Sequence, residues 1–398
     1  MARPATTPAA AADALREDRR LMRLAIRLAR AGEGHTRPNP PVGAVVVLDG
    51  QVIGRGTHRA AGQPHAEVEA IRACRRNPRG ATLYVTLEPC STTGRTPPCT
   101  DLIAEHGLRR VCIGCIDPNP RHAGRGIDVL RQGGIAVETG LCEADCRRLI
   151  APFAKRITTG LPWVTLKLAL TLDGRLADRY GRSKWITGEP ARAWVQQLRR
   201  QADAILVGAG TVAADDPELR CRLPGAGDAW RVVIDGAGRL PADRRLFTDA
   251  HAATTIMATT PAGARRLRQT LPAGTAAALW TFRARRDGTL NLADVLRRLS
   301  DEHGVMHVVC EGGGRLAGRL AAAGLVDTFA FVYAPCLLGD AAAVPAVDGP
   351  RWLLGQAPRG QFTEVRRLGG DLLVLAQELQ PDAARPPRLT ETRNGRHP

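Results

Sequence analysis

Short apolar runs alternate with amphipathic segments along most of this 398-residue chain. In the first half, ATLYVTLEPC (residues 81–90) and RRVCIGCID (residues 109–117) have strand-like patterns, and a helix-like pattern follows each of them. Such alternation is typical of a parallel sheet that is covered by helices. Because a chain of this length exceeds one ordinary core, we expect two α/β domains.

The run of alternating elements sets the expected domain boundaries. Residues 18–147 predict a three-layer α/β domain, and residues 160–378 predict a second α/β domain. A helical segment at residues 148–159 would connect them. Within the first domain, Asp49-Gly50 lies between two β-rich runs and predicts a two-residue hairpin turn.

The two ends of the chain differ in composition from the middle. Residues 1–17 are rich in small residues and are expected to form a flexible lead-in to a helix that begins near Asp18. The polar, proline-rich segment 379–398 is expected to be disordered. The chain contains no apolar run of about 18 residues, so the sequence predicts no membrane span.

Cysteine usage and charge narrow the class of protein. Ten cysteines without a secretory signal pattern favour metal binding, catalysis or burial over a disulfide framework, and we expect a cytoplasmic protein. The net charge of +17 raises the question of nucleic-acid binding. However, the basic residues are dispersed and only 4% of the residues are aromatic, so we predict no specific nucleic-acid partner.

One set of residues in the first half is typical of metal chemistry. His65 and Glu67 form an H-x-E pair near a predicted helix start, and Pro89-Cys90 and Cys99 follow. One imidazole and two thiolates suit zinc, and three protein ligands leave its fourth position for water. Glu67 would carry a proton to the leaving amine, as in the zinc base deaminases that share this signature. Eight residues separate the two cysteines, whereas the usual signature has two.

The same residues also have a purely structural interpretation, in which His65 begins a helix and the cysteines are buried as small apolar residues. The order of the whole set, with each member at the end of an element, favours the metal site. Two further cysteine pairs are interpreted as structural. Cys112 and Cys115 lie inside a strand pattern, and Cys142 and Cys146 have no histidine or further cysteine nearby in the sequence.

The second half has the parts of a nicotinamide-dependent reductase. Gly312–Gly314 follow an apolar strand pattern and precede a helical one, so their backbone amides can hold a pyrophosphate. A second glycine-rich turn ends at Thr211. Asp215 and Asp216 lie near Arg222, where a carboxylate can act beside a phosphate-binding guanidinium. The two aspartates can equally be read as turn or capping residues.

Long motifs in a fixed order give the chain a resemblance to a known family. They are PNPPVGAVVV, HAEVEA, VTLEPC, GRTPPC and DPNPRHAGRG in the first half, and TTGLPWVTLKLALTLDGRLA, SKWITG, ILVGAGTVAADDPELRCR and CEGGG in the second. Over residues 20–378 the chain resembles the bifunctional riboflavin-biosynthesis deaminase/reductases. The resemblance implies a cytidine-deaminase-like three-layer domain followed by a dihydrofolate-reductase-like α/β domain.

The resemblance also implies two successive reactions. A zinc-dependent deaminase would hydrolyse the 2-amino group of 2,5-diamino-6-(5-phosphoribosylamino)pyrimidin-4(3H)-one. An NADPH-dependent reductase would then reduce the ribosyl group of the resulting 5-amino-6-(5-phosphoribosylamino)uracil to ribityl. The implied cofactors are therefore Zn²⁺ and NADPH, and the implied partner is a small phosphoribosylaminopyrimidine.

Matching the motifs residue by residue implies individual roles. His65, Cys90 and Cys99 would be the zinc ligands, and Glu67 would be the proton shuttle. The implied substrate contacts are Asn39, Arg95, Ser183, Arg199, Leu219, Arg222 and Glu311. The implied cofactor contacts are Ala169, Trp185, Thr211, Asp215, Gly313 and Gly314.

Two residues have further expected roles, and three alternative functions are compatible with the sequence. Of the two aspartates, Asp216 is the preferred acid of the reductase. Thr92 stands where many relatives carry histidine, so we expect altered substrate affinity there with intact zinc hydrolysis. The alternatives are a paralogue with one active half, a paralogue with a different aminopyrimidine substrate, and a nucleic-acid deaminase. Apolar faces on two linked domains are also compatible with a homo-oligomer.

Overall fold

The computed structural model describes residues 8–93, 97–272, 274–349 and 351–380. Arg95 and residues 381–398 of the predicted disordered tail lie outside the described residues. Within the described ranges, no helix is both long enough and apolar enough to cross a membrane. All ten cysteines are described, and each is a free thiol.

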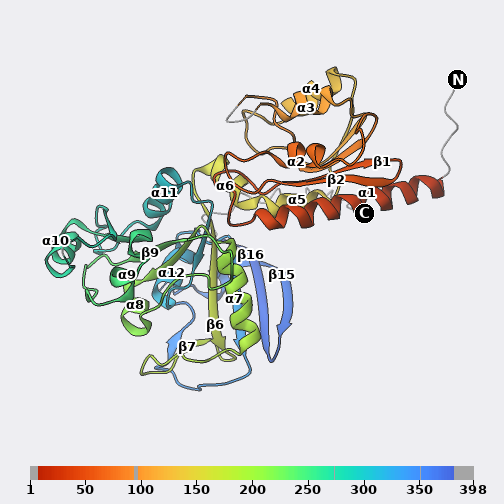
Figure 1. The fold of residues 1–398 in the computed structure, drawn as a ribbon. Coiled ribbons are helices and arrows are strands. Elements are labelled where there is room, and N and C mark those ends of the chain that lie inside the picture. Colours follow the sequence, from red (N-terminus) through yellow and green to blue (C-terminus); the bar gives the residue numbers. More distant parts are fainter. Residues whose placement is uncertain (1–7, 94–96, 273, 350, 381–398) are drawn as a thin grey trace, which may run out of the picture. The chain divides into compact units, whose positions relative to one another are not determined.

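The chain divides into two compact units, each with its own main sheet (Figure 1). The first unit consists of Met1–Trp163, Pro224–Gly227 and Leu296–His307. The second consists of Val164–Leu223, Asp228–Val295 and Val308–Pro398.

The first unit is built on five strands. These are β1 (Gly43–Leu48), β2 (Gln51–Thr57), β3 (Thr82–Leu87), β4 (Arg110–Cys115) and β5 (Ala136–Thr139). Their order in the sheet is β2-β1-β3-β4-β5, with β1 antiparallel to β2 and β3 and with β3, β4 and β5 parallel. The helices are α1 (Pro8–Ala29), η1 (Arg30–Gly32), α2 (Ala66–Arg72), α3 (Cys99–Glu105), α4 (Arg125–Gln132), α5 (Glu143–Leu149) and α6 (Ala151–Thr159).

Helices cover both faces of this sheet. Because successive strand residues point to opposite faces, β1 buries Ala44 and Val46 on one side and Val45 and Val47 on the other. The first pair shares a core with α2, α3 and α4, and the second shares a core with α1 and α5 (Figure 1). The predicted three-layer arrangement is confirmed.

Two local predictions are also confirmed. Leu48 pairs with Gln51 across the turn, and both turn residues, Asp49 and Gly50, have positive φ angles of 51° and 73°. A turn of this kind requires positive φ at both central positions, which aspartate and glycine tolerate. The helix expected near His65 is α2, with His65 as its N-cap residue.

The first helix begins earlier than predicted. It starts at Pro8, ten residues before the expected start near Asp18, so residues 8–17 are helical and not a flexible lead-in. Alanine, which dominates the first turns, has the highest intrinsic helix propensity. Two ion pairs at i, i+3 spacing, Asp13 with Arg16 and Glu17 with Arg20, lie along the same stretch.

The second half of the chain forms a larger sheet. Its nine strands are β6 (Trp163–Thr171), β8 (Ala204–Gly208), β9 (Trp230–Ile234), β10 (Thr255–Thr259), β11 (Ala278–Thr281), β12 (His307–Cys310), β13 (Thr328–Ala334), β15 (Arg359–Leu368) and β16 (Asp371–Gln380). A small separate sheet joins β7 (Arg175–Ala177) and β14 (Val344–Pro345). The helices are α7 (Glu189–Gln201), α8 (Ala209–Asp215), α9 (Arg245–Thr248), η2 (Ala252–Thr254), α10 (Pro261–Thr270), α11 (Leu292–His303), α12 (Gly314–Ala322) and η3 (Leu354–Gln356).

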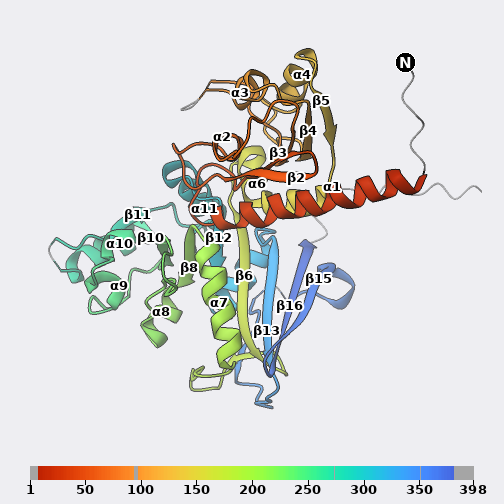
Figure 2. The same cartoon turned by 45° about the vertical axis from the view of Figure 1, so that its right-hand side comes forward.

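The large sheet has the order β11-β10-β9-β8-β12-β6-β13-β16-β15. The pairs from β11 to β8, β8 with β12, and β6 with β13 are parallel, whereas β16 is antiparallel to both of its neighbours, β13 and β15 (Figure 2). The hairpin β15–β16 was not among the predicted elements. Nine of the ten residues of β15 are exposed, so this edge strand lacks the apolar alternation by which strands are recognised.

A partly buried ion pair anchors β9 of the large sheet. Arg231 in β9 is completely buried and donates hydrogen bonds to both carboxylate oxygens of Asp249, at 2.6 and 2.8 Å. It also donates to the backbone carbonyls of Glu218 and Leu246. Burial alone would raise the pKa of Asp249, but the hydrogen bonds from Arg231 outweigh it and the pKa is lowered. The pair therefore ties β9 to the end of α9.

We expect Arg231→Met to lower the free energy of unfolding of the second unit by about 2 kcal/mol, because the Asp249 carboxylate and two backbone carbonyls lose a charged hydrogen-bond donor. Urea unfolding followed by circular dichroism measures this change. The matched control is Arg268→Met, at an exposed position of α10, which should change the free energy by less than about 0.5 kcal/mol. Coincident unfolding curves for Arg231→Met and the unaltered protein would contradict the expectation.

Candidate active sites

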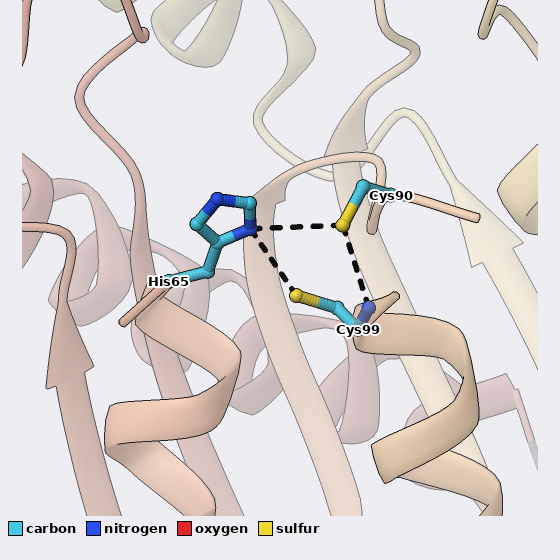
Figure 3. A group of neighbouring side chains, drawn as sticks. All are labelled: His65, Cys90 and Cys99. Carbon is cyan, nitrogen blue, oxygen red and sulfur yellow. Dashed lines mark hydrogen bonds between the residues drawn. The ribbon is translucent and has the colours of Figure 1, made fainter. Parts of the chain in front are cut away.

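Three metal-binding side chains converge in the first unit. The ligand atoms of His65, Cys90 and Cys99 all lie within 4.8 Å of one another. His65 Nδ1 is 3.6 Å from Cys90 Sγ and 3.3 Å from Cys99 Sγ (Figure 3). In the part of the chain that the structure describes, no other group of three or more such side chains could hold a metal ion.

The ends of three elements bring these side chains together. His65 is the N-cap of α2, Cys99 is the first residue of α3, and Cys90 follows the end of β3. The Cys99 backbone N–H donates to Cys90 Sγ at 3.4 Å, and the Thr100 N–H donates to the Cys90 carbonyl at 3.2 Å. The first turn of α3 therefore closes onto Cys90 although eight residues intervene.

The electrostatics of this group favour a thiolate at Cys90. A hydrogen bond from the Cys99 thiol lowers the pKa of Cys90 to about 4, with a further contribution from His65 and against the effect of burial. The same hydrogen bond, together with burial, raises the pKa of Cys99. One imidazole and two sulfur donors at these separations fit a zinc ion with three protein ligands and one open position.

Glu67 lies beside the three ligands, in the first turn of α2. Its side chain is buried, with 3% of the residue exposed. Burial raises the pKa of Glu67, and the neighbouring His65 opposes this increase. A carboxyl group with a raised pKa holds a proton more readily than an ordinary glutamate, which suits a group that takes up a proton and then returns it.

A buried histidine that the sequence analysis did not single out holds Asn39. His58 follows β2 and is 2% exposed. Its Nδ1 lies 3.1 Å from the Pro64 carbonyl oxygen, and its Nε2 lies 3.1 Å from Asn39 Nδ2. Its ring meets the His65 ring edge-on, with the centroids 5.2 Å apart. The available signal was a histidine seven residues before His65, at the end of a predicted strand.

Glu88, directly before Pro89-Cys90, is a second residue that the sequence analysis passed over. The residue is 6% exposed. Its carboxylate accepts hydrogen bonds from the backbone N–H groups of Asp117, Gly124, Gly126 and Ile127. A Cβ atom at Gly126 would lie 2.1 Å from the Pro89 carbonyl oxygen, so only glycine fits there. The start of α4 and the loop before it are thereby held against the Cys90 turn.

The segment between the two cysteine ligands is described in part. Thr92 and Thr93 are exposed. Arg95 lies outside the described residues, so its expected contact with substrate stays a prediction. Cys112, Cys115 and Cys146 are buried in the core between β4 and α5, as expected for structural cysteines.

The second unit contains a partly buried charged cluster. Arg199 of α7 binds Glu311, which follows β12, through two hydrogen bonds of 2.7 and 2.9 Å. Burial favours the neutral form of Glu311, but Arg199 outweighs it and the pKa of Glu311 is lowered. Lys167 of β6 is the third member: burial lowers its pKa, and Glu311 opposes this decrease.

Lys167 was not among the predicted site residues. It is one of only three lysines in the chain and interrupts the apolar strand segment TLKLAL, which is the signal that could have identified it. It lies two residues before Ala169, so both side chains project from the same face of β6.

The two glycine-rich turns that the sequence analysis singled out lie side by side. A Cβ atom at Gly313 would lie 3.9 Å from Thr211 Oγ1, which places the start of α12 next to α8. At Gly314 a Cβ atom would lie 2.3 Å from the Pro345 carbonyl oxygen, so this position requires glycine. Gly313 is the N-cap residue of α12 and has no side chain to cap the helix.

The two neighbouring aspartates have different partners. Asp215 Oδ1 lies 3.8 Å from Lys184 Nζ. Asp216 has a positive φ of 41°, and its carboxylate accepts a 2.9 Å hydrogen bond from the Arg245 backbone N–H and forms an ion pair with the Arg245 side chain. The structure therefore gives Asp216, the preferred acid in the sequence analysis, a capping contact with α9.

Of the remaining predicted substrate contacts in this unit, Leu219 and Arg222 lie near Arg199. Arg199 donates to the Arg220 carbonyl at 2.9 Å, which places the turn from Leu219 to Arg222 beside the Arg199–Glu311 pair. Leu219 is buried and has a positive φ of 49°. The Arg222 side chain is exposed, and Ser183 is half-buried.

Two family models match this chain, one in each half. Residues 15–115 match the cytidine and deoxycytidylate deaminase zinc-binding region, and residues 162–374 match the RibD C-terminal domain.

Similar whole proteins cover both halves. The riboflavin biosynthesis protein RibD of Bacillus amyloliquefaciens is 43% identical over 357 residues, which are 89% of this chain and 95% of that protein. Its counterpart from Escherichia coli is 39% identical over 372 residues, covering 90% of this chain and 98% of that protein.

Two solved structures are also similar to this chain over most of its length. Acinetobacter baumannii RibD has a TM-score of 0.81 and 36% identity, and it covers 92% of this chain and 100% of that chain. A diaminohydroxyphosphoribosylaminopyrimidine deaminase/5-amino-6-(5-phosphoribosylamino)uracil reductase from Thermotoga maritima has a TM-score of 0.82 and 35% identity, and it covers 92% and 99%.

These likenesses confirm the fold and the two activities that the resemblance implied. They extend over nearly the full length of the relatives and over both candidate sites. The chain belongs to the RibD family of bifunctional deaminase/reductases of riboflavin biosynthesis.

Proposed function

We propose that each unit performs one of the two RibD reactions with the residues assembled above. The observation that supports this most directly is the approach of three donor atoms to within 4.8 Å of one another beside a buried glutamate. A structural role alone would not require an acid with a raised pKa at that place.

In the deaminase unit, His65, Cys90 and Cys99 would hold the zinc ion. When bound, a zinc ion of this kind supplies a water molecule that is activated at neutral pH. The Glu67 carboxylate takes up a proton at one oxygen and returns it to the amine that leaves the pyrimidine. Burial raises the pKa of Glu67 and so favours uptake of the proton, while the nearby His65 opposes this increase.

Substrate recognition in this unit would use the side chains around the ligands. Asn39 offers its amide to the pyrimidine and is held in place by His58. Arg95 would contact the substrate from the segment between the cysteines. Thr92 can donate or accept a hydrogen bond but cannot carry a proton as histidine does, so substrate affinity would change there while hydrolysis is kept.

In the reductase unit, NADPH would bind along Ala169, Trp185, Thr211, Asp215, Gly313 and Gly314. The phosphoribosyl group would bind at Ser183, Arg199, Leu219, Arg222 and Glu311. Reduction of the ring-opened ribosylamine needs a hydride and an acid. Asp215 is a better candidate for that acid than Asp216, because Asp216 is bound to the start of α9. Lys167, whose pKa is lowered by burial, is a second candidate proton donor, in the cluster with Arg199 and Glu311.

We also propose a cytoplasmic, small-molecule enzyme without a specific nucleic-acid partner. Ten free thiols suit a reducing compartment, and the basic residues form no long run. Homo-oligomer formation is supported by exposed apolar residues on the edge strand β15, Phe362 and Val365.

We expect Glu67→Gln to reduce deamination by about 100- to 10,000-fold, because the amide cannot carry the proton. Zinc content should be unchanged, since Glu67 is not a proposed ligand. Reduction of the deaminated substrate should also be unchanged, because it takes place in the other unit. Mass spectrometry of the products, together with NADPH consumption, separates the two steps. If Glu67→Gln also stopped reduction of the deaminated substrate, the division into two sites would be wrong.

We expect Cys99→Ser to lose both zinc and deamination, because a hydroxyl is a poor replacement for a thiolate ligand. Metal analysis of the purified protein measures the zinc. The matched control is Cys74→Ser, since the Cys74 thiol, just after the end of α2, donates to the Ala70 carbonyl of that helix, a bond that serine can also form. Full zinc occupancy in Cys99→Ser would remove Cys99 from the ligand set.

A further inference from the structure

Trp185 is an exposed aromatic residue with a cation on one side. Its surface is 70% exposed, although tryptophan is usually among the well-buried residues. The guanidinium carbon of Arg192 lies 4.7 Å from the centroid of the indole. This is the separation of a cation–π contact. With so much of the ring exposed, the opposite face of the indole is open to a ligand.

Arg192 is itself fixed more firmly than the tryptophan. It lies in the first half of α7, and its neighbours Ala191 and Val195 bury the helix against the sheet. Its guanidinium also donates a 2.7 Å hydrogen bond to the Thr187 backbone carbonyl. Arg192 therefore connects a packed helix both to the indole and to the segment that carries it.

The other anchor of this segment is weaker. Lys184, next to Trp185, reaches Asp215 at the end of α8, with 3.8 Å between Nζ and Oδ1. The Lys184 side chain is 56% exposed, and exposed ion pairs contribute little to stability. Of the two contacts, that of Arg192 constrains the indole directly.

We infer that Arg192 is a positioning residue of the reductase: it braces one face of the Trp185 indole so that the other face can stack on a planar ring of NADPH. The inference rests on the proposed placement of Trp185 in the cofactor site. An indole that is already oriented binds a ring with a smaller loss of conformational entropy than a freely rotating one. The guanidinium acts through the tryptophan and need not touch the cofactor.

The test uses Arg192→Gln in the full-length enzyme, with NADPH binding followed by fluorescence titration. Glutamine keeps an amide that can donate to Thr187 and removes the positive charge. We expect the Kd for NADPH to rise about 3- to 10-fold, the range expected for the loss of one partly exposed cation–π contact. The KM for NADPH should rise more than kcat falls. The matched control is Arg200→Gln, an exposed arginine near the end of the same helix, which should leave the Kd unchanged.

A double-mutant cycle with Trp185→Ala decides whether Arg192 acts through the indole. If it does, Arg192→Gln has no further effect once Trp185 is alanine. Equal weakening in both backgrounds would overturn the inference, and so would an unchanged Kd for Arg192→Gln while Trp185→Ala binds NADPH weakly. If the substitutions raise only the KM of the pyrimidine substrate, the indole contacts that substrate and not NADPH, and the inference is overturned as well. If Trp185→Ala leaves the Kd unchanged, the proposed placement of Trp185 fails and the inference fails with it.

Discussion

Both candidate sites draw many of their reactive groups from the ends of strands and the starts of helices. A side chain inside an element is directed by its period toward one face, so groups that must meet usually come from the termini, where the chain leaves the sheet. In the first unit, His65 and Cys99 begin helices and Cys90 follows β3. In the second, Thr211 and Gly313 lie at the starts of α8 and α12. The two units share no motif, yet the same constraint builds both sites.

Buried charged side chains hold these strand and helix ends in place through hydrogen bonds. Glu88 accepts four backbone N–H groups and holds the loop before α4, and Asp371 accepts the Gly188 N–H at 2.7 Å at the start of α7. Arg199 and Glu311 satisfy each other through two hydrogen bonds. Burying a charge without partners costs on the order of several kcal/mol, so each of these groups strongly favours one arrangement of its loop. Exposed residues such as Trp185 are held by fewer contacts and are free to meet a ligand.

Hydrophobic periodicity in a sequence indicates which elements have one buried face. This sets how much of the structure can be predicted from the sequence. Strands and helices with one apolar face were predicted at nearly their observed places. The sequence also pointed to the three candidate metal ligands that the structure brings together, because these residues sit where those patterns end. Periodicity gave no indication of β15, whose residues are almost all exposed, or of the early start of α1. Three polar residues, His58, Glu88 and Lys167, were missed because their importance comes from partners far away in the sequence. For the same reason the sequence could not separate Asp215 from Asp216, whose carboxylates meet different partners.

The long spacing between the two cysteine ligands is compatible with an intact metal site. Extending a loop from two to eight residues costs only about 1 kcal/mol in closure entropy. Two hydrogen bonds oppose that cost, from Cys99 N–H to the Cys90 sulfur and from Thr100 N–H to the Cys90 carbonyl. The positions of the sulfur atoms are therefore set by the two ends of the loop and not by the residues between them. Substitutions within the loop, of which Thr92 is one, can then alter contacts with the substrate while the ligand geometry, and with it the hydrolytic chemistry, stays the same.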